Sequence, residues 1–454
     1  PEFVFQTGSV IRNRLTVTGF HLGNKLQNRL ATAAQILVQG NAFRCAHGII
    51  AFQRLFPVVS GAAAPEARTE AGADVFKKDI AEIRRRLNSE SHNPIDIRGC
   101  YVNGKNGIID RGSTVRSNLN MDWERPVNFE YLTADGRMIV NQEAGFEVMG
   151  GYSRHFAPAS FKVKARKLYD DKGDFGSPVF AGKPYCKYKQ LIIRNGGNNN
   201  RTNGGPRIKD AITQQALTSS GYYVDAQEYQ PVHVFVNGKY LAMMNVREPN
   251  NRFHGCANYG YDDDAMDGFE YSSGGYHQKG GDREAFDRLI ALSENAGTEE
   301  GYAEVCALLD MEEFVRYMAV ICYTGSYDWL LNGNNVKGYR TREDGKFHFV
   351  LFDQDLTWER TDNVQAIEGV TKNEVLALYN NLKRSKTFCR QFVTSYCILH
   401  GSVYTPERCQ AVADSICRLV EKALSFENLI SFTDEQLRKV AIHGTVVEHL
   451  EDEA

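Results

Sequence analysis

The chain has 454 residues, 42% of them hydrophobic, which is ordinary for a globular protein with room for two or three domains. Its formal net charge of −3 argues against the basic surface of a nucleic-acid-binding protein. The sequence contains no apolar run long enough for a transmembrane helix and shows no signal-peptide pattern at its start. We therefore expect a globular chain with no membrane span and no nucleic-acid partner.

The ten cysteines are scattered, with neither a CxxC pair nor a neighbouring histidine cluster. This pattern argues against a structural zinc site. Cys306 and Cys322 lie within apolar helical patterns, which is typical of small buried side chains.

The first part of the chain offers no recognisable chemistry. Residues 1–60 mix strand-like and helix-like patterns. Residues 61–96 begin with an Ala-, Gly- and Pro-rich linker and continue with a charged helix over residues 75–91.

The next unit, residues 97–280, is predicted to be rich in β-structure. Residues 126–140 form two short apolar runs around an Asp-Gly turn, and residues 229–248 repeat this pattern around an Asn-Gly turn. Both patterns predict β-hairpins. Residues 254–278 contain four aspartates within six positions but lack the spacing of an EF-hand, so we expect a solvated loop there.

Two segments of this unit suit phosphate groups. Alternation over residues 161–166 places Lys162, Lys164 and Arg166 on one strand face, which either meets phosphates or faces solvent. Further on, a buried strand ends at Arg194 and is followed by a Gly/Asn-rich loop and a helix near Pro206. Such a loop can bind an anion, although it matches neither a Walker A nor a GxGxxG pattern.

From residue 281 to 430 the pattern is mainly helical, and residues 431–454 form a tail. Asp310 is predicted to cap the helix that precedes Asp328, with Glu313 three residues later as in a capping box. The overall class is therefore α+β, with strands in the first half and helices in the second.

The stretch from Tyr327 to Glu359 contains the most suggestive chemistry. Asp328 is followed by an Asn-rich loop, then by a hairpin-like pair of apolar runs, and then by Asp353 and Asp355. Protein kinases use the same order of parts: a base Asp and a metal-binding Asn in one loop, then a second metal-binding Asp after a hairpin. The chain has no HRD or DFG motif, so only this order matches.

Ten stretches between about residues 120 and 360 make the comparison specific, because they resemble the CotH (spore-coat protein H) kinase family, especially its larger bacterial members, in the same order. The stretches are NMDWERPVNFEY, AGFEVMGGYSRHF, KVKARKLY, LIIRNGGN, PRIKDAI, VFVNGKYLAMMNVRE, ANYGYDDDAMDGFE, GDREAFDRLIALSENA, DWLLNGNNVKGYR and GKFHFVLFDQDLTWE.

The resemblance implies a two-lobed atypical protein-kinase fold with a β-rich N-terminal lobe and a helical C-terminal lobe. It also implies ATP and Mg²⁺ or Mn²⁺ as cofactors, a protein substrate rich in Ser and Thr, and an extracytoplasmic, cell-surface or spore-coat setting.

By position, Asp328 resembles the family's catalytic acid. The resemblance also implies a metal site and a nucleotide site. The metal site comprises Asp353 with its companion Asp355, and Asn335 with Asn334. The nucleotide site comprises Arg194, Gly196 and Gly197, with Lys162, Lys164 or Lys167 supplying the phosphate-binding cation.

The sequence departs from the family pattern at three places, and these departures favour an alternative function. Ala159 stands where relatives commonly have Lys, Asn198 stands where they have Asp, and the loop after Trp329 lacks a Pro and is two residues longer. The rival is a weakly active or inactive surface or coat scaffold on the same fold. A hydrolase with two carboxylates is less favoured, because Asp353 and Asp355 are expected on one side of a strand.

Overall fold

The computed structural model describes residues 48–53 and 124–430, with gaps at 135, 157, 181–182, 184–186, 201–204, 237–238, 273–274, 344 and 360–372. The predicted linker, the charged helix, the C-terminal tail and most of the N-terminal segment lie outside the described residues.

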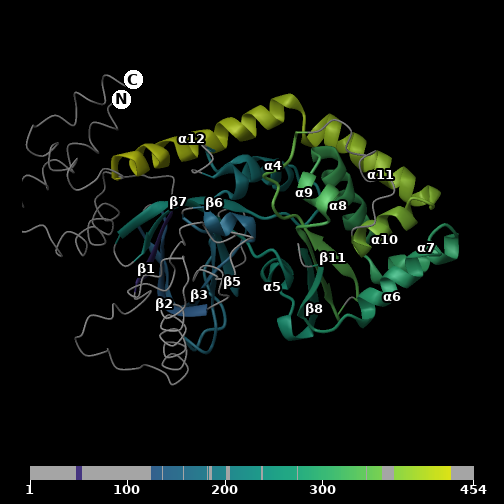
Figure 1. Cartoon of the computed structure of the whole chain (residues 1–454), viewed down its shortest axis with the longest axis horizontal. Coiled ribbons are helices and arrows are strands. Elements are labelled where there is room, and N and C mark those ends of the chain that lie inside the picture. Colours follow the sequence, from purple (N-terminus) through teal and green to yellow (C-terminus); the bar gives the residue numbers. More distant parts are fainter. Residues whose placement is uncertain are drawn as a thin grey trace, which may run out of the picture.

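Seven strands close into a barrel in the order β1-β2-β3-β4-β5-β7-β6 (Figure 1). Neighbouring strands are antiparallel except β1 and β6, which run parallel and close the barrel. The strands are β1 (Gly48–Gln53), β2 (Glu124–Leu132), β3 (Met138–Val148), β4 (Phe161–Lys164), β5 (Gln190–Arg194), β6 (Tyr229–Val236) and β7 (Lys239–Arg247). Both predicted hairpins are confirmed, as β2–β3 and β6–β7.

Alternating side chains fill the barrel. Val127 and Phe129 of β2 are fully buried, as are Ala144 of β3 and Val163 of β4. They belong to one apolar cluster that continues through β5, β6 and β7. Fully burying a large apolar side chain contributes about 1.5–3 kcal/mol, so the inward face is what holds the barrel together.

Two helices cover the outside of the barrel. Helix α4 (Lys209–Thr218) follows the short turn η3 (Gly197–Asn199), and the long helix α12 (Pro406–Ile430) packs on α4, β6 and β7 (Figure 1). A separate apolar cluster fills this contact. Its buried members are Ile208, Ala211, Tyr229, Met243, Ile416, Val420 and Ala423.

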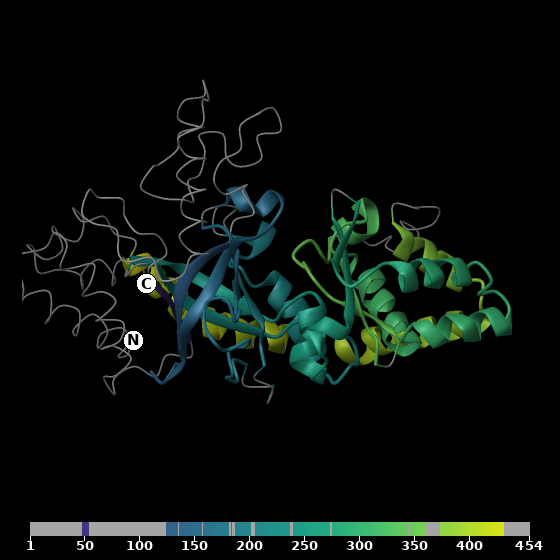
Figure 2. The ribbon, with the colours of Figure 1, turned by 90° about the horizontal axis from the view of Figure 1, so that it is seen from below.

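A second, four-stranded sheet has the order β11-β10-β8-β9 and lies beside the barrel with the remaining helices (Figure 2). Its strands are β8 (Met266–Ser272), β9 (Gly275–Gly280), β10 (Val336–Thr341) and β11 (Phe347–Val350). The other helices are α5 (Arg252–Tyr259), α6 (Glu284–Ser293), α7 (Glu299–Leu308), α8 (Met311–Thr324), α9 (Tyr327–Asn332), α10 (Glu374–Leu382) and α11 (Lys386–Ile398). Short turns are η2 (Tyr152–His155), η5 (Asp263–Ala265) and the π-turn η7 (Leu399–Val403).

The Asp-rich stretch is more ordered than its composition indicated. The prediction of a solvated loop over residues 254–278 is wrong, because this stretch contains the end of α5 and the strands β8 and β9. Asp267 is buried and accepts hydrogen bonds from Arg340 at 2.9 Å and Arg342 at 3.0 Å. Asp267 is therefore buried because two arginines pair with its carboxylate, and such pairing cannot be predicted from composition.

The mixed α+β class is confirmed. Of the described cysteines, Cys256 and Cys322 are buried, and none of the seven is in a disulfide. In the part of the chain that the structure describes, no helix has both the length and the apolar character to cross a membrane.

Candidate functional site

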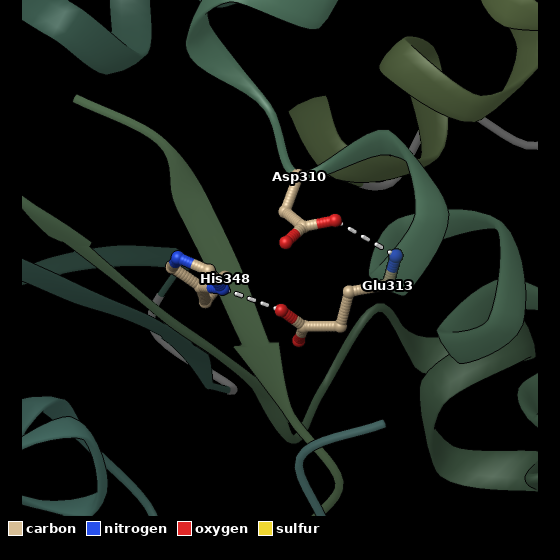
Figure 3. A group of neighbouring side chains, drawn as sticks. All are labelled: Asp310, Glu313 and His348. Carbon is tan, nitrogen blue, oxygen red and sulfur yellow. Dashed lines mark hydrogen bonds and ion pairs between the residues drawn. The ribbon is translucent and has the colours of Figure 1, made fainter. Parts of the chain in front are cut away.

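Helix α8, which leads towards the predicted catalytic loop, begins at a charged cluster whose members are buried except for the partly exposed Asp310 (Figure 3). Asp310 caps the helix as predicted, accepting a hydrogen bond from the Glu313 amide at 3.0 Å. The Glu313 side chain does not complete a capping box. It hydrogen-bonds His348 of β11 at 2.6 Å and accepts from the Phe349 amide at 2.9 Å.

Asp310, Glu313 and His348 have potential metal-ligating atoms within 4.8 Å of one another. Each carboxylate oxygen is already engaged, however, because the second oxygen of Asp310 accepts a hydrogen bond from the Tyr223 hydroxyl at 3.1 Å. We therefore interpret this cluster as the attachment of α8 to β11, not as a metal centre.

Glu313 gives the folded chain a defined pH dependence. Burial raises its pKa from 4.5 to about 7, with help from the charge of Asp225 and opposition from His348. A carboxyl group with a raised pKa binds more protons when folded, so the free energy of unfolding should fall as pH rises from 4.5 to about 7. In Glu313→Gln this slope should weaken by up to about 1.4 kcal/mol per pH unit, as measured by urea unfolding at several pH values.

The matched control is Glu304→Gln on the exposed surface of α7, which should leave the slope unchanged. An equal slope in the Glu313→Gln variant and the unchanged chain would contradict this assignment.

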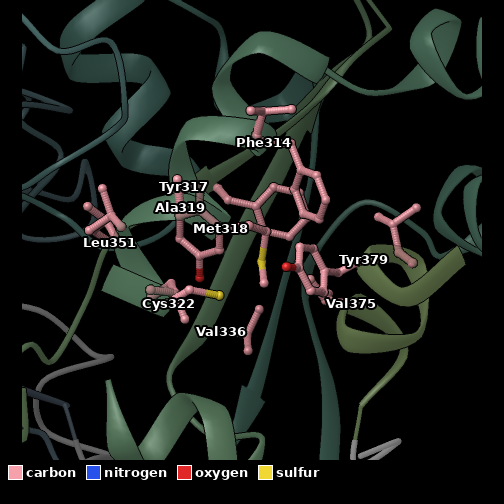
Figure 4. Packing of buried hydrophobic residues seen from close by; sticks show 14 of the residues in the cluster. Phe314, Tyr317, Met318, Ala319, Cys322, Val336, Leu351, Val375 and Tyr379 are labelled. Atoms are coloured by element: carbon pink, nitrogen blue, oxygen red, sulfur yellow. The ribbon is translucent and has the colours of Figure 1, made fainter. Parts of the chain in front are cut away.

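The inner face of α8 lies in the largest apolar core (Figure 4). Phe314, Tyr317, Met318 and Cys322 are all essentially inaccessible to solvent. They pack with residues of the second sheet and of α10. This packing holds α8 rigidly, and the helix ends at Gly325 just before α9.

Asp328 lies in the first turn of α9, where its carboxylate holds one side-chain amide from the end of α9 and one from the following loop. Its carboxylate accepts hydrogen bonds from Asn332 at 2.6 Å and Asn335 at 3.1 Å. Asn334 bonds to the same residue through its backbone, donating to the Asp328 carbonyl at 3.1 Å. Asn335 has a left-handed backbone (φ 61°), which is uncommon outside glycine and recurs at functional sites.

A second pair of acids converges on Arg194 at the end of β5. The Arg194 guanidinium contacts Asp355 at 3.1 Å and also forms an ion pair with Asp353. Burial disfavours the charge of Arg194, but Asp353, Asp210 and Asp355 outweigh this effect and raise its pKa. The guanidinium also lies over the ring of Phe352, 5.3 Å from its centre.

The two acids differ in environment. Asp353 is 23% exposed and Asp355 only 1%. Burial and the charge of Asp353 raise the pKa of Asp355 to about 7, although Arg194 works in the opposite direction. The expectation that both acids lie on a strand is wrong, because β11 ends at Val350 and Asp353 is left-handed (φ 59°). A tight turn therefore brings the carboxylates together on one arginine.

The glycine loop lies directly against this acid pair. Gly196 and Gly197 both have left-handed backbones (φ 96° and 60°). The amide of Asn198 donates to Asp355 at 2.6 Å. A Cβ at Gly197 would collide with the Asp355 carboxylate and with the Arg194 guanidinium, so only glycine fits there.

Sequence reasoning missed Asn195, which shapes the loop from inside. Its side-chain oxygen accepts hydrogen bonds from the Ser160 hydroxyl at 2.9 Å and from the Gly197 amide at 3.0 Å. Asn195 is buried directly after the apolar strand β5. A polar residue at such a position in the sequence was the signal that could have identified it. Ala159, next to Ser160, is half-buried against the barrel core. Because alanine has no charged group, this position contributes no cation.

Backbone contacts place the Asp328 loop beside the Asp353–Asp355 turn. The Tyr327 amide donates to the Leu356 carbonyl at 3.0 Å, and the Trp358 amide donates to Thr324 at 2.6 Å. The two groups of predicted site residues are therefore carried by adjoining segments.

The three candidate lysines are placed differently. Lys162 and Lys164 share Glu147, and Lys164 also contacts Glu124 at 3.0 Å, so the basic strand face is neutralised by acids. Lys167 lies exposed after β4, with its aliphatic chain near Gly173.

A second lysine–glutamate pair, which sequence reasoning also missed, lies close to Lys162. Lys337 of β10 is paired with Glu270 of β8 and lies 5.2 Å from the centre of the Phe352 ring. Burial lowers the pKa of Lys162, and the charges of Lys337 and Glu270 are near enough to act on it. The charge of a lysine on the second sheet therefore reaches a lysine on the barrel, and Lys337 itself lies beside the segment that leads to Asp353.

Comparison with known families gave one result for this chain. A family model described as CotH kinase protein matches residues 146–428, well over half of the chain. The match begins within β3, ends within α12 and includes every predicted site residue. A comparison with curated proteins gave no match.

Proposed function

Because the chain belongs to the CotH kinase family, we propose that it transfers the γ-phosphoryl group of ATP to Ser or Thr hydroxyls of a protein substrate. The observation that supports this proposal most is the convergence of the glycine loop and Arg194 on Asp353 and Asp355, beside the segment that carries Asp328. Under this proposal the barrel is the N-terminal lobe and the helical part with the second sheet is the C-terminal lobe.

The donor groups fit Mg²⁺ or Mn²⁺. Asp353, Asp355 and Asn335 offer carboxylate and amide oxygens, which these hard cations prefer. Burial first, and then the charge of Asp353, raise the pKa of Asp355, so a nearby cation would favour its ionised form. When bound there, the metal would neutralise charge on the ATP phosphates.

The chain's own groups would position ATP. The backbone of the loop at Gly196 and Gly197 would lie close to the phosphates because neither residue has a side chain, while the Gly197 amide itself is held by Asn195. Glu147 orients Lys162, and Glu270 orients Lys337, which lies near Phe352. A lysine held by a glutamate is the arrangement that kinases use on phosphates. Lys162 therefore takes the role that Ala159 cannot fill.

Asp328 would orient the acceptor hydroxyl and receive its proton. The amides of Asn332 and Asn335 hold the carboxylate in one orientation, and Asp328 remains half-exposed and so accessible to a substrate. A positioned general base of this kind contributes roughly 10²–10⁴-fold to the rate.

Asp328→Asn should therefore lower kcat by roughly 10²–10⁴-fold and leave the KM for ATP unchanged. The measurement is transfer of labelled phosphate from ATP with Mg²⁺ or Mn²⁺ to the chain itself and to a Ser-rich protein. Asp287→Asn, an exposed aspartate on α6, is the matched control and should keep full activity.

The rival function, an inactive scaffold, predicts a different set of results. It is favoured by Ala159, which leaves the usual cation position apolar. A chain that shows no thermal shift with saturating ATP and Mg²⁺, and no phosphate transfer, would be assigned to the scaffold class. Equal transfer by Asp328→Asn and the unchanged chain would reject the role of Asp328 alone.

A further inference from the structure

Buried charges of alternating sign run from the barrel to the acid pair. Arg247, at the end of β7, is 1% exposed and lies 3.1 Å from one carboxylate oxygen of Asp210. The other oxygen of Asp210 is 3.8 Å from Arg194, which in turn contacts Asp355 and Asp353. This row holds three carboxylates and two guanidiniums, so it retains one negative charge when all five groups are ionised.

Asp210 also holds the backbone of the acid turn. The same oxygen that faces Arg194 accepts a hydrogen bond from the Gln354 amide at 2.7 Å. Gln354 stands between the two acids, directly after the left-handed Asp353. A buried carboxylate on an amide in this position fixes a turn that the local sequence does not favour.

We propose that Asp210 is a positioning residue for a divalent-metal site on Asp353 and Asp355. The inference rests on the proposed function, since it assumes that a metal binds these acids. Arg194 contacts both acids through one terminal nitrogen of its guanidinium, while the second terminal nitrogen faces Asp210. Asp210 therefore competes with the acid pair for Arg194 and leaves the pair available to a metal.

Two substitutions in this row should shift metal affinity in opposite directions. Asp210→Asn removes the carboxylate that draws Arg194 away, so Arg194 should neutralise the acid pair more fully. We expect Mn²⁺ to bind about tenfold more weakly, as when groups that support metal ligands are lost. In Arg247→Met, Asp210 has Arg194 as its only arginine partner of the row and should attract it more strongly. Arg194 should then neutralise the acid pair less, so Mn²⁺ should bind more tightly.

A general loss of packing cannot shift the Mn²⁺ affinity in opposite directions. Each variant removes one partner from the same buried ion pair, so both should lose stability and a packing effect would act in the same direction in both. Asp210 in Arg247→Met keeps its hydrogen bonds from Gln354 and, at 2.9 Å, from Gln214, so the carboxylate is not left without partners.

The experiment is calorimetric titration of the full chain with Mn²⁺, without nucleotide, alongside thermal unfolding. Asp282→Asn, an exposed aspartate before α6, is the control and should keep the original affinity. Weaker binding by Asp210→Asn together with tighter binding by Arg247→Met supports the inference. Unchanged affinity in both variants, or a loss in both, overturns it.

The two levels of the proposal fail differently. If the unchanged chain binds no Mn²⁺, both the metal-dependent function and the role of Asp210 are rejected. If the unchanged chain binds Mn²⁺ but the variants do not shift in opposite directions, only the role of Asp210 is rejected. If Asp210→Asn does not fold, Arg247→Met decides alone, because weaker or unchanged binding by that variant overturns the inference.

Discussion

Asp353→Asn is expected to lower phosphate transfer by at least about a thousandfold, because a catalytic metal supplies several kcal/mol of transition-state stabilisation. Asp353 is the more exposed of the two acids on Arg194, so it is the one open to a ligand. The substitution keeps the shape of the side chain and leaves Arg194 paired with Asp355 and Asp210, so the fold should survive. The measurements are phosphate transfer at saturating ATP and the affinity for Mn²⁺.

An exposed aspartate in the turn η5 provides the control. Asp264→Asn removes one negative charge from the surface without touching the acid pair and should retain full transfer. Transfer by Asp353→Asn at the control's rate would show that the metal site, if present, is elsewhere.

Gly197→Ala is expected to damage both stability and ligand binding. The new Cβ would meet the Asp355 carboxylate and the Arg194 guanidinium at a backbone with φ 60°. A left-handed backbone costs a residue with a side chain about 1–2 kcal/mol, and overpacking adds about 1–3 kcal/mol. The free energy of unfolding should therefore fall by roughly 3 kcal/mol, and the thermal shift caused by ATP and Mg²⁺ should disappear.

Gly221→Ala separates the two causes. Gly221 has φ 71°, close to that of Gly197, but a Cβ there would meet nothing within 4 Å. This variant should lose only about 1–2 kcal/mol and keep its response to ATP. Equal losses in the two variants would show that backbone strain alone, without the collision, accounts for the cost at Gly197.

Local patterns predicted most of the secondary structure because the governing signals lie within a few residues. The Asp-Gly turn at Gly136 predicted the β2–β3 hairpin, and Asp310 correctly marked the start of α8. The barrel closure was not predictable in this way. It depends on a parallel pairing between β1 and β6, which are separated by about 180 residues and share no turn.

The candidate site shows the same division. Arg194, Asp353 and Asp355 were selected by resemblance, and the structure brings all three into contact. Asp210 and Arg247 were missed because each is one charged residue on its own helix or strand, and only the folded chain pairs them. Lys167 was selected as a candidate phosphate-binding cation because it follows the basic strand β4, but its side chain lies on the exposed surface.

The left-handed Arg207 backs directly onto the glycine loop, where a Cβ at Gly196 would lie 2.7 Å from its side chain. Its guanidinium forms a buried ion pair with Glu427, near the end of α12. The wall behind the loop is therefore completed by a residue that a ribosome adds some 220 residues later. Until Glu427 is synthesised, the Arg207 guanidinium lacks this carboxylate, so we expect the wall behind the glycine loop to be completed only after α12 has formed.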